Sequence, residues 1–517
     1  MKIVTASEMR QVESKAGKSG VLAEELMRNA GKAVAQQMKH IMGGVVGKRI
    51  LVLVGPGNNG GDGLFTASLL RQEGAEVWAY LCASRSVDDP GPREAMCQGV
   101  LVFASADDRD WSQMARLFTE CDSVLDAVFG TGQNRQIDGV YRLALLSITK
   151  HKGLRPSMSV FALDIPSGLS PDNGQADLSC PQADYTITLG CPKRGLFTEN
   201  GVKHAGKVVT VDIGIPIEAI KDLSCEELGE LWARATLPSR FPFANKGSFG
   251  KVLALAGSKE YVGAACLCCG GALRAGAGRV TLAGLRSVQS VLAGINPEVT
   301  YLSLQETVGG LFIPENYKTL LDVASGYDVF LVGCGLGPTE EAKTLALKTV
   351  FRLSQECKLV VDADALNYLS SVPKWWMRIP QDAVLTPHVG EMARLCGISI
   401  DEVKKDCFEL LRKKAAEWNK TIVLKDAISL IASPRGEVRV NNCPNAGMAS
   451  AGTGDVLAGV IAGLAAQGLA LFNAACLGVY LHSCAGSAVR LKMGDMGMLA
   501  SDVVAELPYA IKRLKDN

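Results

Sequence analysis

The sequence predicts an α/β protein of two consecutive domains, a three-layer α/β/α sandwich followed by a second, larger α/β sandwich. Short apolar runs alternate with helical stretches along the chain, as in parallel sheets covered by helices. This alternation restarts after a mixed stretch at residues 222–242, and 517 residues exceed one hydrophobic core. We therefore expect one domain over residues 1–225 and another over residues 230–517.

Composition excludes several classes of function. The 54 Lys and Arg residues nearly balance the 53 Asp and Glu residues, so a net charge of +1 predicts no pull toward nucleic acid or anionic membranes. The chain has no apolar run near the roughly 20 residues that span a bilayer. Its start is polar rather than signal-like, and its 16 cysteines lack paired C-x-x-C motifs. We expect a cytoplasmic protein with reduced, structural cysteines.

The first half of the chain opens with two predicted helices. Residues 5–8, Thr-Ala-Ser-Glu, form a capping-box pattern. Residues 23–42 then place apolar side chains on one helical face. The parallel strands that follow are expected at residues 50–55, 76–81, 123–127 and 159–163.

A glycine-rich turn at residues 55–63 follows the first of these strands and leads into a helical run at residues 64–70. Gly55, Gly57 and Gly60 match the dinucleotide fingerprint G-x-G-x-x-G, whose amides bind phosphate. The match is a weak signal in a chain with 55 glycines, and no acid for a ribose hydroxyl follows the next strand. We therefore expect a nucleotide-like ligand bound in a different mode.

Polar residues gather where three of these strands end, which is where α/β sheets bind ligands. Each acid alone is typical of a helix cap or turn, but three together favour a site. Oxygen ligands without cysteine or histidine suit a hard cation, and Asp164 is a candidate general acid or base. The strand-end residues are Asn58, Asn59 and Asp62; Asp126 with the stretch 130–135; and Asp164 with Ser167.

The second half repeats this organisation. A helix rich in Ala and Gly is expected at residues 263–276, where small residues allow close packing. Glycines or polar residues again follow the strands, at 333–337, 362–364, 386–388 and 425–426. The expected strands are residues 251–256, 279–283, 327–332, 358–361, 383–385 and 421–424.

The stretch 445–455, N-A-G-M-A-S-A-G-T-G-D, precedes an apolar helix expected at residues 456–466. Free amides at a helix start can surround a transferring phosphate, and Asp455 would take a proton from an attacking hydroxyl. Asp455 is equally compatible with a first-turn acid that matches the helix dipole. No G-x-x-x-x-G-K-[ST] motif is present, which disfavours a P-loop kinase.

Three ordered motifs, N-N-G-G-D-G, L-D-A-V-F-G-T-G and A-L-D-I-P-S-G, resemble the NAD(P)H-hydrate epimerase family, the Rossmann-like YjeF N-terminal domain. The resemblance covers roughly residues 1–220. It implies interconversion of the R and S forms of NAD(P)H hydrated at C6, with Asp164 as the catalytic group and K⁺ bound by Asn59, Asp126 and Ser167. The implied substrate contacts are Asn58, Asn59, Gly60, Gly61, Asp62, Gly130, Thr131, Gly132, Gln133, Asn134, Arg135, Gln136 and Asp164.

Motifs of the second half, K-G-S-F-G-K-V-L-A-L-A-G-S, V-D-A-D-A-L-N, L-T-P-H-V-G-E and A-G-T-G-D, resemble the ribokinase-like ADP-dependent NAD(P)H-hydrate dehydratases. This resemblance covers roughly residues 230–515 and implies Asp455 as the base and residues 452–454 as an anion hole. The implied hydrate contacts are Ala265, Gly335, His388 and Asp455. The implied nucleotide contacts are Lys425, Asp426, Ala427, Ile428, Ser429, Gly452, Thr453 and Gly454.

Two positions depart from the dehydratase pattern. Asp426 stands where glycine is usual and adds a negative charge near the nucleotide phosphates, and Val389 stands where proline is usual. His388 has a second interpretation, because a lone histidine is often a structural residue whose hydrogen bonds are satisfied.

Together the two halves resemble the bifunctional NAD(P)H-hydrate repair enzymes, an isomerase fused to a lyase. This implies the substrates NADHX and NADPHX, K⁺ in the first domain, and ADP (or ATP) with Mg²⁺ in the second. Homo-oligomerisation is expected as well. One alternative is a ribokinase-like kinase of a small alcohol whose first half is a non-catalytic binding module.

Overall fold

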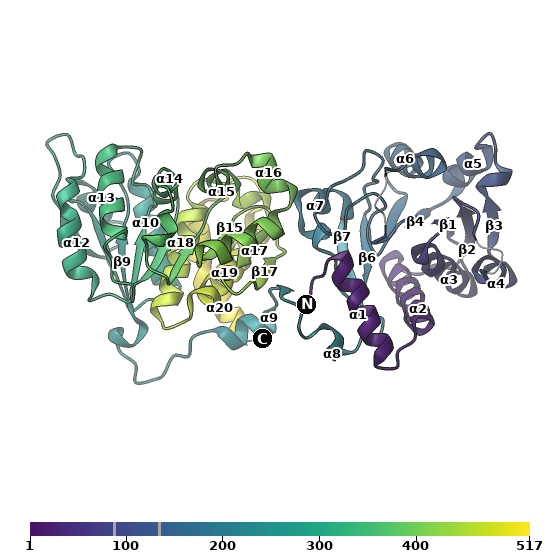
Figure 1. The fold of residues 1–517 in the computed structure, drawn as a ribbon, viewed down its shortest axis with the longest axis horizontal. Helices are drawn as coiled ribbons and strands as arrows, with labels where there is room; N and C mark the ends of the chain where they lie inside the picture. Colours follow the sequence, from purple (N-terminus) through teal and green to yellow (C-terminus); the bar gives the residue numbers. More distant parts are fainter. Residues whose placement is uncertain (86–88, 133–135, 517) are drawn as a thin grey trace. The chain divides into compact units, whose positions relative to one another are not determined.

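The structure is a computed structural model that describes residues 1–85, 89–132 and 136–516. The chain divides into two compact units, Met1–Cys225 and Glu226–Asn517 (Figure 1). Each unit is built around one sheet, so the two units are described in turn.

The first unit contains a seven-stranded, wholly parallel sheet in the order β3-β2-β1-β4-β5-β6-β7. The strands are β1 (Arg49–Val54), β2 (Glu76–Leu81), β3 (Leu101–Ala104), β4 (Ser123–Ala127), β5 (Ser159–Leu163), β6 (Tyr185–Leu189) and β7 (Lys207–Val211). The helices are α1 (Ala6–Lys18), α2 (Ala23–Met42), α3 (Asn58–Gln72), α4 (Gly91–Cys97), α5 (Ser112–Glu120), α6 (Gly139–Leu154), α7 (Glu199–Ala205) and α8 (Ile217–Ile220).

Both faces of this sheet are buried, which confirms the predicted three-layer sandwich. Alternate residues of β1 enter different cores, since Val52 packs with α2 and α3 while Leu53 packs with α5 and α6. Figure 1 shows α2 and α3 below this sheet and α5 and α6 above it. The capping box at Thr5 and Glu8 is also confirmed.

The second unit contains a ten-stranded sheet in the order β11-β10-β9-β12-β13-β14-β15-β16-β17-β8. Pairing is parallel from β11 to β15 and antiparallel between β15, β16 and β17. The strands are β8 (Cys225–Glu227), β9 (Lys251–Leu255), β10 (Arg279–Leu285), β11 (Thr300–Leu304), β12 (Val329–Val332), β13 (Lys358–Val361), β14 (Ala383–Leu385), β15 (Thr421–Leu424), β16 (Ser429–Ala432) and β17 (Val438–Asn441).

Twelve α-helices are seen in the described residues of this unit, and two of them, α10 and α18, pack unusually closely. An added Cβ at Gly459 of α18 would lie 2.0 Å from the Cys268 carbonyl oxygen of α10. Only glycine permits this approach, which confirms the predicted small-residue packing. The helices are α9 (Glu230–Thr236), α10 (Val262–Arg274), α11 (Arg286–Leu292), α12 (Tyr317–Ala324), α13 (Glu340–Val350), α14 (Asp364–Ser370), α15 (Val389–Cys396), α16 (Ile400–Lys405), α17 (Cys407–Trp418), α18 (Thr453–Ala466), α19 (Leu471–Met493) and α20 (Ala500–Asp516).

Two helices begin earlier than the sequence predicts. The predicted helical run 64–70 belongs to α3, which starts at Asn58, and the predicted helix 456–466 belongs to α18, which starts at Thr453. Glycine and asparagine have low helix propensity, but packing against the sheet overrides that preference. Asn58, Asn59 and Asp62 therefore lie in the first turns of α3, and Asp455 lies in the first turn of α18.

In each sheet the strand order reverses direction at one point, called the switch point. Ligands of open α/β sheets bind in the crevice at this point. In the first unit the switch point lies between β1 and β4, which lead into the glycine turn and the Gly130 segment. In the second unit it lies between β9 and β12, which lead into Gly257 and the Gly333 segment. The predicted polar residues therefore lie at the carboxyl ends of the strands, which is where ligands are expected.

All sixteen cysteines are free thiols. No helix within the described residues has both the length and the apolar character needed to cross a bilayer.

Candidate active sites

Asp126 forms the buried centre of a polar cluster in the first unit. Its carboxylate accepts hydrogen bonds from the Ser167 amide (2.8 Å) and the Val128 amide (3.2 Å), and the Ser167 hydroxyl lies 2.6 Å away. Asp126 and Ser167 have no exposed surface, and burial raises the pKa of Asp126. The structure therefore brings together two of the three residues predicted to bind a cation.

Asn59, the third of these residues, is also buried, and its Nδ2 atom has no hydrogen-bond partner among the described residues. An added Cβ at Gly130 would lie 3.3 Å from Asn59 Oδ1, so the α3 start meets the loop that follows β4. The unpaired Nδ2 atom is a donor, so the Oδ1 atom is the group of this side chain that could bind a cation. The amide, carboxylate and hydroxyl oxygens of this set suit a hard cation such as K⁺.

Asp164 is held on a strained turn directly after β5, with a φ of +68° that few residues other than glycine adopt. Its carboxylate accepts hydrogen bonds from the Leu189 amide (3.0 Å) and the Thr188 hydroxyl (3.2 Å), and it pairs with the Lys193 ammonium. Lys193 is itself buried. These contacts fix the orientation of the Asp164 side chain at the carboxyl end of β5.

Asp62 is the second carboxyl group of this crevice. Burial first, and then the negative charges of Asp164 and Glu13, raise the pKa of Asp62 to about 8, with Lys193 opposing the shift. At neutral pH, Asp62 therefore holds a proton. A protonated carboxyl group close to a second carboxyl group that pairs with a lysine is a pattern expected of an acid–base pair.

Arg85, which follows β2, stabilises the glycine-rich turn between β1 and α3. Its Nη1 donates to the carbonyl oxygens of Gly55 and Gly57, and its Nε pairs with Asp89. A Cβ at Gly60 would lie 2.1 Å from the Gly55 carbonyl oxygen, so this turn requires glycine.

The other predicted epimerase contacts lie at the start of α3 and in the loop that follows β4. Asn58, Gly60 and Gly61 lie in the first turn of α3, and Gly130, Thr131 and Gly132 follow β4. Gln136 is exposed, and Gln133, Asn134 and Arg135 lie outside the described residues.

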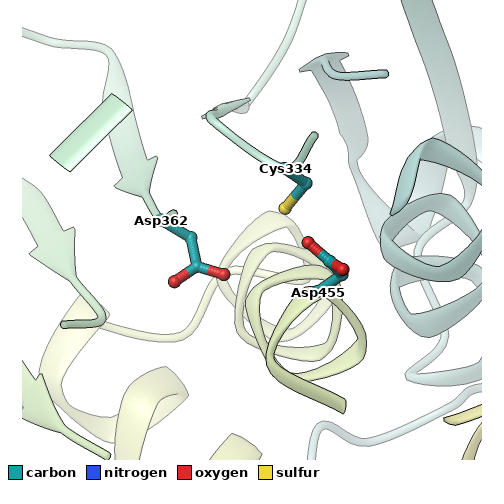
Figure 2. A group of neighbouring side chains, drawn as sticks. All are labelled: Cys334, Asp362 and Asp455. Atoms are coloured by element: carbon teal, nitrogen blue, oxygen red, sulfur yellow. The ribbon is translucent and has the colours of Figure 1, made fainter. Parts of the chain in front are cut away.

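In the second unit, Asp455 meets two residues that follow neighbouring strands. The Cys334 thiol comes from the turn after β12, and Asp362 comes directly after β13 (Figure 2). One ligand atom of each of the three side chains lies within 4.8 Å of the others. Burial and the charge of Asp362 raise the pKa of Asp455 to about 7, against the Cys334 hydrogen bond and the Lys425 charge.

Lys425 places a positive charge at the start of α18. Its Nζ lies 2.6 Å from Asp362 Oδ1, and an added Cβ at Gly454 would lie 3.2 Å from that nitrogen. Thr386 also donates to Asp362, at 2.7 Å. The α18 N-cap, Gly452, makes no side-chain capping bond, so the first amides of this 14-residue helix are open to an anion.

His388 has a local structural role and also exposes its ring. Its Nδ1 accepts from the amides of Gly390 (3.0 Å) and Glu391 (3.3 Å), which caps α15. The side chain is 53% exposed, and burial together with the charges of Lys425 and Arg394 lowers its pKa. Since Nδ1 is an acceptor, the neutral ring of this exposed side chain carries its proton on Nε2, which lies 3.5 Å from Glu391 Oε1.

The remaining predicted dehydratase contacts lie around this centre. Ala265 is fully buried on α10, and Gly335 adopts a φ of +63° against Tyr261 and Ala264. Thr453 begins α18, Asp426, Ala427 and Ile428 form the turn between β15 and β16, and Ser429 begins β16.

Sequence reasoning missed Lys193, Arg85 and Cys334 as site residues. Lys193 lies in a loop four residues after β6, and nothing in its local sequence indicates burial beside Asp164. Cys334 was visible only as part of a glycine-rich strand end. Its contact with Asp455 depends on α18 packing against β12, which is a long-range property of the fold.

Comparison with known proteins identifies the family. Residues 23–195 match the family described as YjeF-related protein N-terminus, and residues 252–509 match NAD(P)H-hydrate dehydratase. The chain is 38% identical to the bifunctional NAD(P)H-hydrate repair enzyme of Moorella thermoacetica over 100% of this chain and 98% of that protein. The chain belongs to the bifunctional NAD(P)H-hydrate repair enzyme family.

A second member of this repair enzyme family, from Thermofilum pendens, is 35% identical over 100% of this chain and 97% of its own length. A ribokinase-like superfamily protein from Enterococcus faecalis is 26% identical, with a TM-score of 0.50 over 57% of this chain and 98% of that chain. The predicted fold class, and the pairing of an epimerase with a dehydratase, are therefore confirmed at the level of the repair enzyme family.

Proposed function

We propose that this repair enzyme restores hydrated NADH and NADPH in two steps. The first unit interconverts the R and S hydrates, and the second dehydrates the S form with ADP, releasing AMP and phosphate. The arrangement of Asp455 beside Lys425 at the open start of α18 supports this function most directly, because it joins a base to an anion site. ATP is the alternative phosphoryl donor, and Mg²⁺ would accompany either nucleotide.

Epimerisation requires the C6 hydroxyl to leave from one face of the nicotinamide ring and water to add to the other. We assign the two proton transfers to the two carboxyl groups of the first crevice. Protonated Asp62 donates to the departing hydroxyl, which leaves as water and produces a cationic ring. Asp164, which Lys193 holds in place, then accepts a proton from the water that attacks C6, and the R and S forms exchange.

K⁺ would be held by Asn59, Asp126 and Ser167 at the edge of the same crevice. When bound, it supplies a fixed positive charge beside the buried Asp126 carboxylate. Asn58, Gly60 and Gly61, with the loop 130–136, would contact the dinucleotide.

Dehydration begins with proton transfer from the C6 hydroxyl to Asp455 as that oxygen attacks the terminal phosphorus of the nucleotide. The amides of residues 452–454 and the Lys425 ammonium stabilise the transferring phosphoryl group. AMP leaves as the phosphoryl group is transferred. The C6–O bond then breaks, phosphate leaves with the electron pair, and the C5 proton passes to solvent water as the C5=C6 double bond forms. His388 and Gly335 would contact the hydrate, and residues 425–429 the adenine nucleotide. Ala265 has no exposed surface and would support this site from α10.

Purified S hydrate, incubated with the protein and ADP, ATP or no nucleotide, tests this assignment. We expect near-ultraviolet absorbance to recover with ADP, with one phosphate released per NAD(P)H formed. Accumulation of a stable phosphorylated product would instead indicate a small-alcohol kinase.

The dehydration rate should depend on pH through Asp455. The base acts in its ionised form, and its pKa is raised to about 7, so kcat should rise with pH and level off above that value. Below it, kcat should fall about tenfold per pH unit. We would measure kcat from about pH 5.5 to 9 in the wild type. A flat profile between about pH 6 and 8 would contradict the assignment of Asp455 as the base.

Removal of K⁺ should slow epimerisation and leave dehydration of the S form unchanged. Asp126→Asn should abolish the K⁺ dependence, because it removes the charge at the centre of the cluster. The melting temperature of the wild type should rise with added K⁺ by mass action, while that of D126N should not respond. An equal rise in both proteins would place the cation elsewhere.

We also propose that the protein is cytoplasmic and forms homo-oligomers. Sixteen free thiols are typical of a reducing compartment. Leu491, Met496 and Leu499 expose 59–92% of their surface near the end of α19 and the start of α20, which favours an interface with another subunit.

A further inference from the structure

Three neighbouring strands of the second sheet are each followed by a polar residue, and these three residues contact one another. Asp362 directly follows β13, Thr386 directly follows β14 and Lys425 directly follows β15. The strands pair in parallel, so their carboxyl ends meet on one side of the sheet. A carboxylate at this anion site requires an explanation, because the charge of Asp362 would repel a phosphate.

Asp362 holds the Lys425 ammonium group through a close ion pair. Lys425 Nζ lies 2.6 Å from Asp362 Oδ1, and only 1% of the Asp362 side chain is exposed. A lysine has a flexible four-carbon stem, so its charge has no fixed position unless a partner holds it. A charge-assisted bond to a buried carboxylate fixes that position. The bond uses one N–H of the ammonium group and leaves the others for a phosphate.

The Thr386 hydroxyl fixes the orientation of the Asp362 carboxylate. Thr386 has no exposed surface, and its hydroxyl donates to Asp362 Oδ1 at 2.7 Å. The Val361 carbonyl oxygen is the alternative acceptor and is farther away, at 3.2 Å. The Thr386 amide also donates to that carbonyl oxygen, at 3.1 Å, so the sheet itself anchors the residue that orients Asp362.

The ammonium group that Asp362 holds lies beside the start of α18. An added Cβ at Gly454, the second residue of this helix, would lie 3.2 Å from Lys425 Nζ and 3.9 Å from Asp362 Oδ2. The ion pair is therefore adjacent to the main chain whose first amides are open to an anion. A change of rotamer at Lys425 would carry the positive charge away from these amides.

We propose that Asp362, oriented by Thr386, is a positioning residue that holds the Lys425 ammonium group beside the α18 amides, where it stabilises the transferring phosphoryl group. This inference rests on the dehydratase function proposed above. The carboxylate weakens the attraction of Lys425 for a phosphate, but a charge already in place needs no reorganisation during the reaction. Loss of Asp362 should therefore lower kcat and leave the KM for the hydrate unchanged.

Asp362→Ala and Lys425→Ala, alone and combined, test whether Asp362 acts through Lys425. Each single variant should lower the kcat of S-hydrate dehydration about 10- to 100-fold, with the KM for the hydrate within about twofold of wild type. The double variant should be at most about threefold slower than K425A, because Asp362 then has no lysine to position. We would take kcat from the high-pH plateau of each profile, so that changes in the pKa of Asp455 do not affect the comparison.

Thr386→Val tests the orienting hydroxyl in a protein that keeps both charges. It should lower kcat about 3- to 10-fold, whereas Thr386→Ser, which retains the hydroxyl, should stay within about twofold of wild type. Thr349→Val is the matched control. Thr349 is equally buried, donates at 2.8 Å to the Leu345 carbonyl oxygen within α13, and should be replaceable without effect on kcat.

The stability of the four proteins of the Asp362 and Lys425 cycle must be compared as well. D362A leaves a buried lysine without its partner, and the double variant removes that unpaired charge, so the double variant remains informative if D362A unfolds. Wild-type kcat in D362A, effects of D362A and K425A that multiply in the double variant, or equal losses in T386S and T386V would overturn the proposal. Absence of dehydration by the wild type would instead overturn the function on which it rests.

Discussion

Replacing Asp164 with asparagine should slow conversion of the R hydrate to the S hydrate by at least about 100-fold, without affecting dehydration of the S form. The amide keeps the size of the carboxylate and its bond from the Leu189 amide, but it cannot accept a proton from water. The assay supplies pure R hydrate with ADP, and the unchanged second unit of the same chain dehydrates the S hydrate as it forms, so the recovery rate reports epimerisation.

Asp122→Asn is the control for Asp164→Asn. Asp122 is also an ion-paired acid, 3.0 Å from Arg49, but it precedes β4 and so lies at the opposite edge of the same sheet. Because D164N leaves the buried Lys193 without its partner, thermal unfolding must be compared as well. A folded D164N protein that repairs the R form at the wild-type rate would exclude Asp164 as the acid–base group.

Replacing Asp455 with asparagine should reduce dehydration by about 100- to 10,000-fold while epimerisation continues. The change removes the base and also a negative charge near the nucleotide phosphates, so the affinity for ADP should be kept or increased. Phosphate release and absorbance recovery should fall together, since phosphoryl transfer precedes elimination.

Asp328→Asn is the matched control for this unit. Its carboxylate accepts a 2.8 Å bond from the Lys251 amide at the amino end of β9, away from the anion hole. If D455N kept full activity and lost only a little stability, about 0.3–1 kcal/mol, Asp455 would be a residue that complements the helix dipole and not a base.

The sequence was sufficient for the architecture because its strongest signals are local. The apolar run that became β1 and the capping box at Thr5 are each readable within a few residues. The starts of α3 and α18 could not be predicted from a few residues. Their first turns contain glycine, and that of α3 also asparagine, which disfavour a helix until packing against the sheet stabilises it. The antiparallel pair β16 and β17 was missed because no helix separates β15, β16 and β17, so the alternation of strands and helices that marks the other strands is absent there.

The sequence predicted the acidic residues of the candidate sites but not the residues that contact them. Asp164 and Asp455 follow strands or begin helices, and their neighbours in sequence mark them. Lys193 reaches Asp164 from a separate loop, and Cys334 meets Asp455 from the turn after β12, so only the fold brings these residues together. A buried lysine is uncommon, and local sequence gives no sign of its burial.

Repair of an equal mixture of R and S hydrates by the intact chain, with ADP, Mg²⁺ and K⁺, tests the central claim most directly. If both sites are active in one chain, the absorbance of NAD(P)H should recover completely. Recovery that stops at half of the mixture would contradict the epimerase assignment, and no recovery with ADP or ATP would contradict the dehydratase assignment.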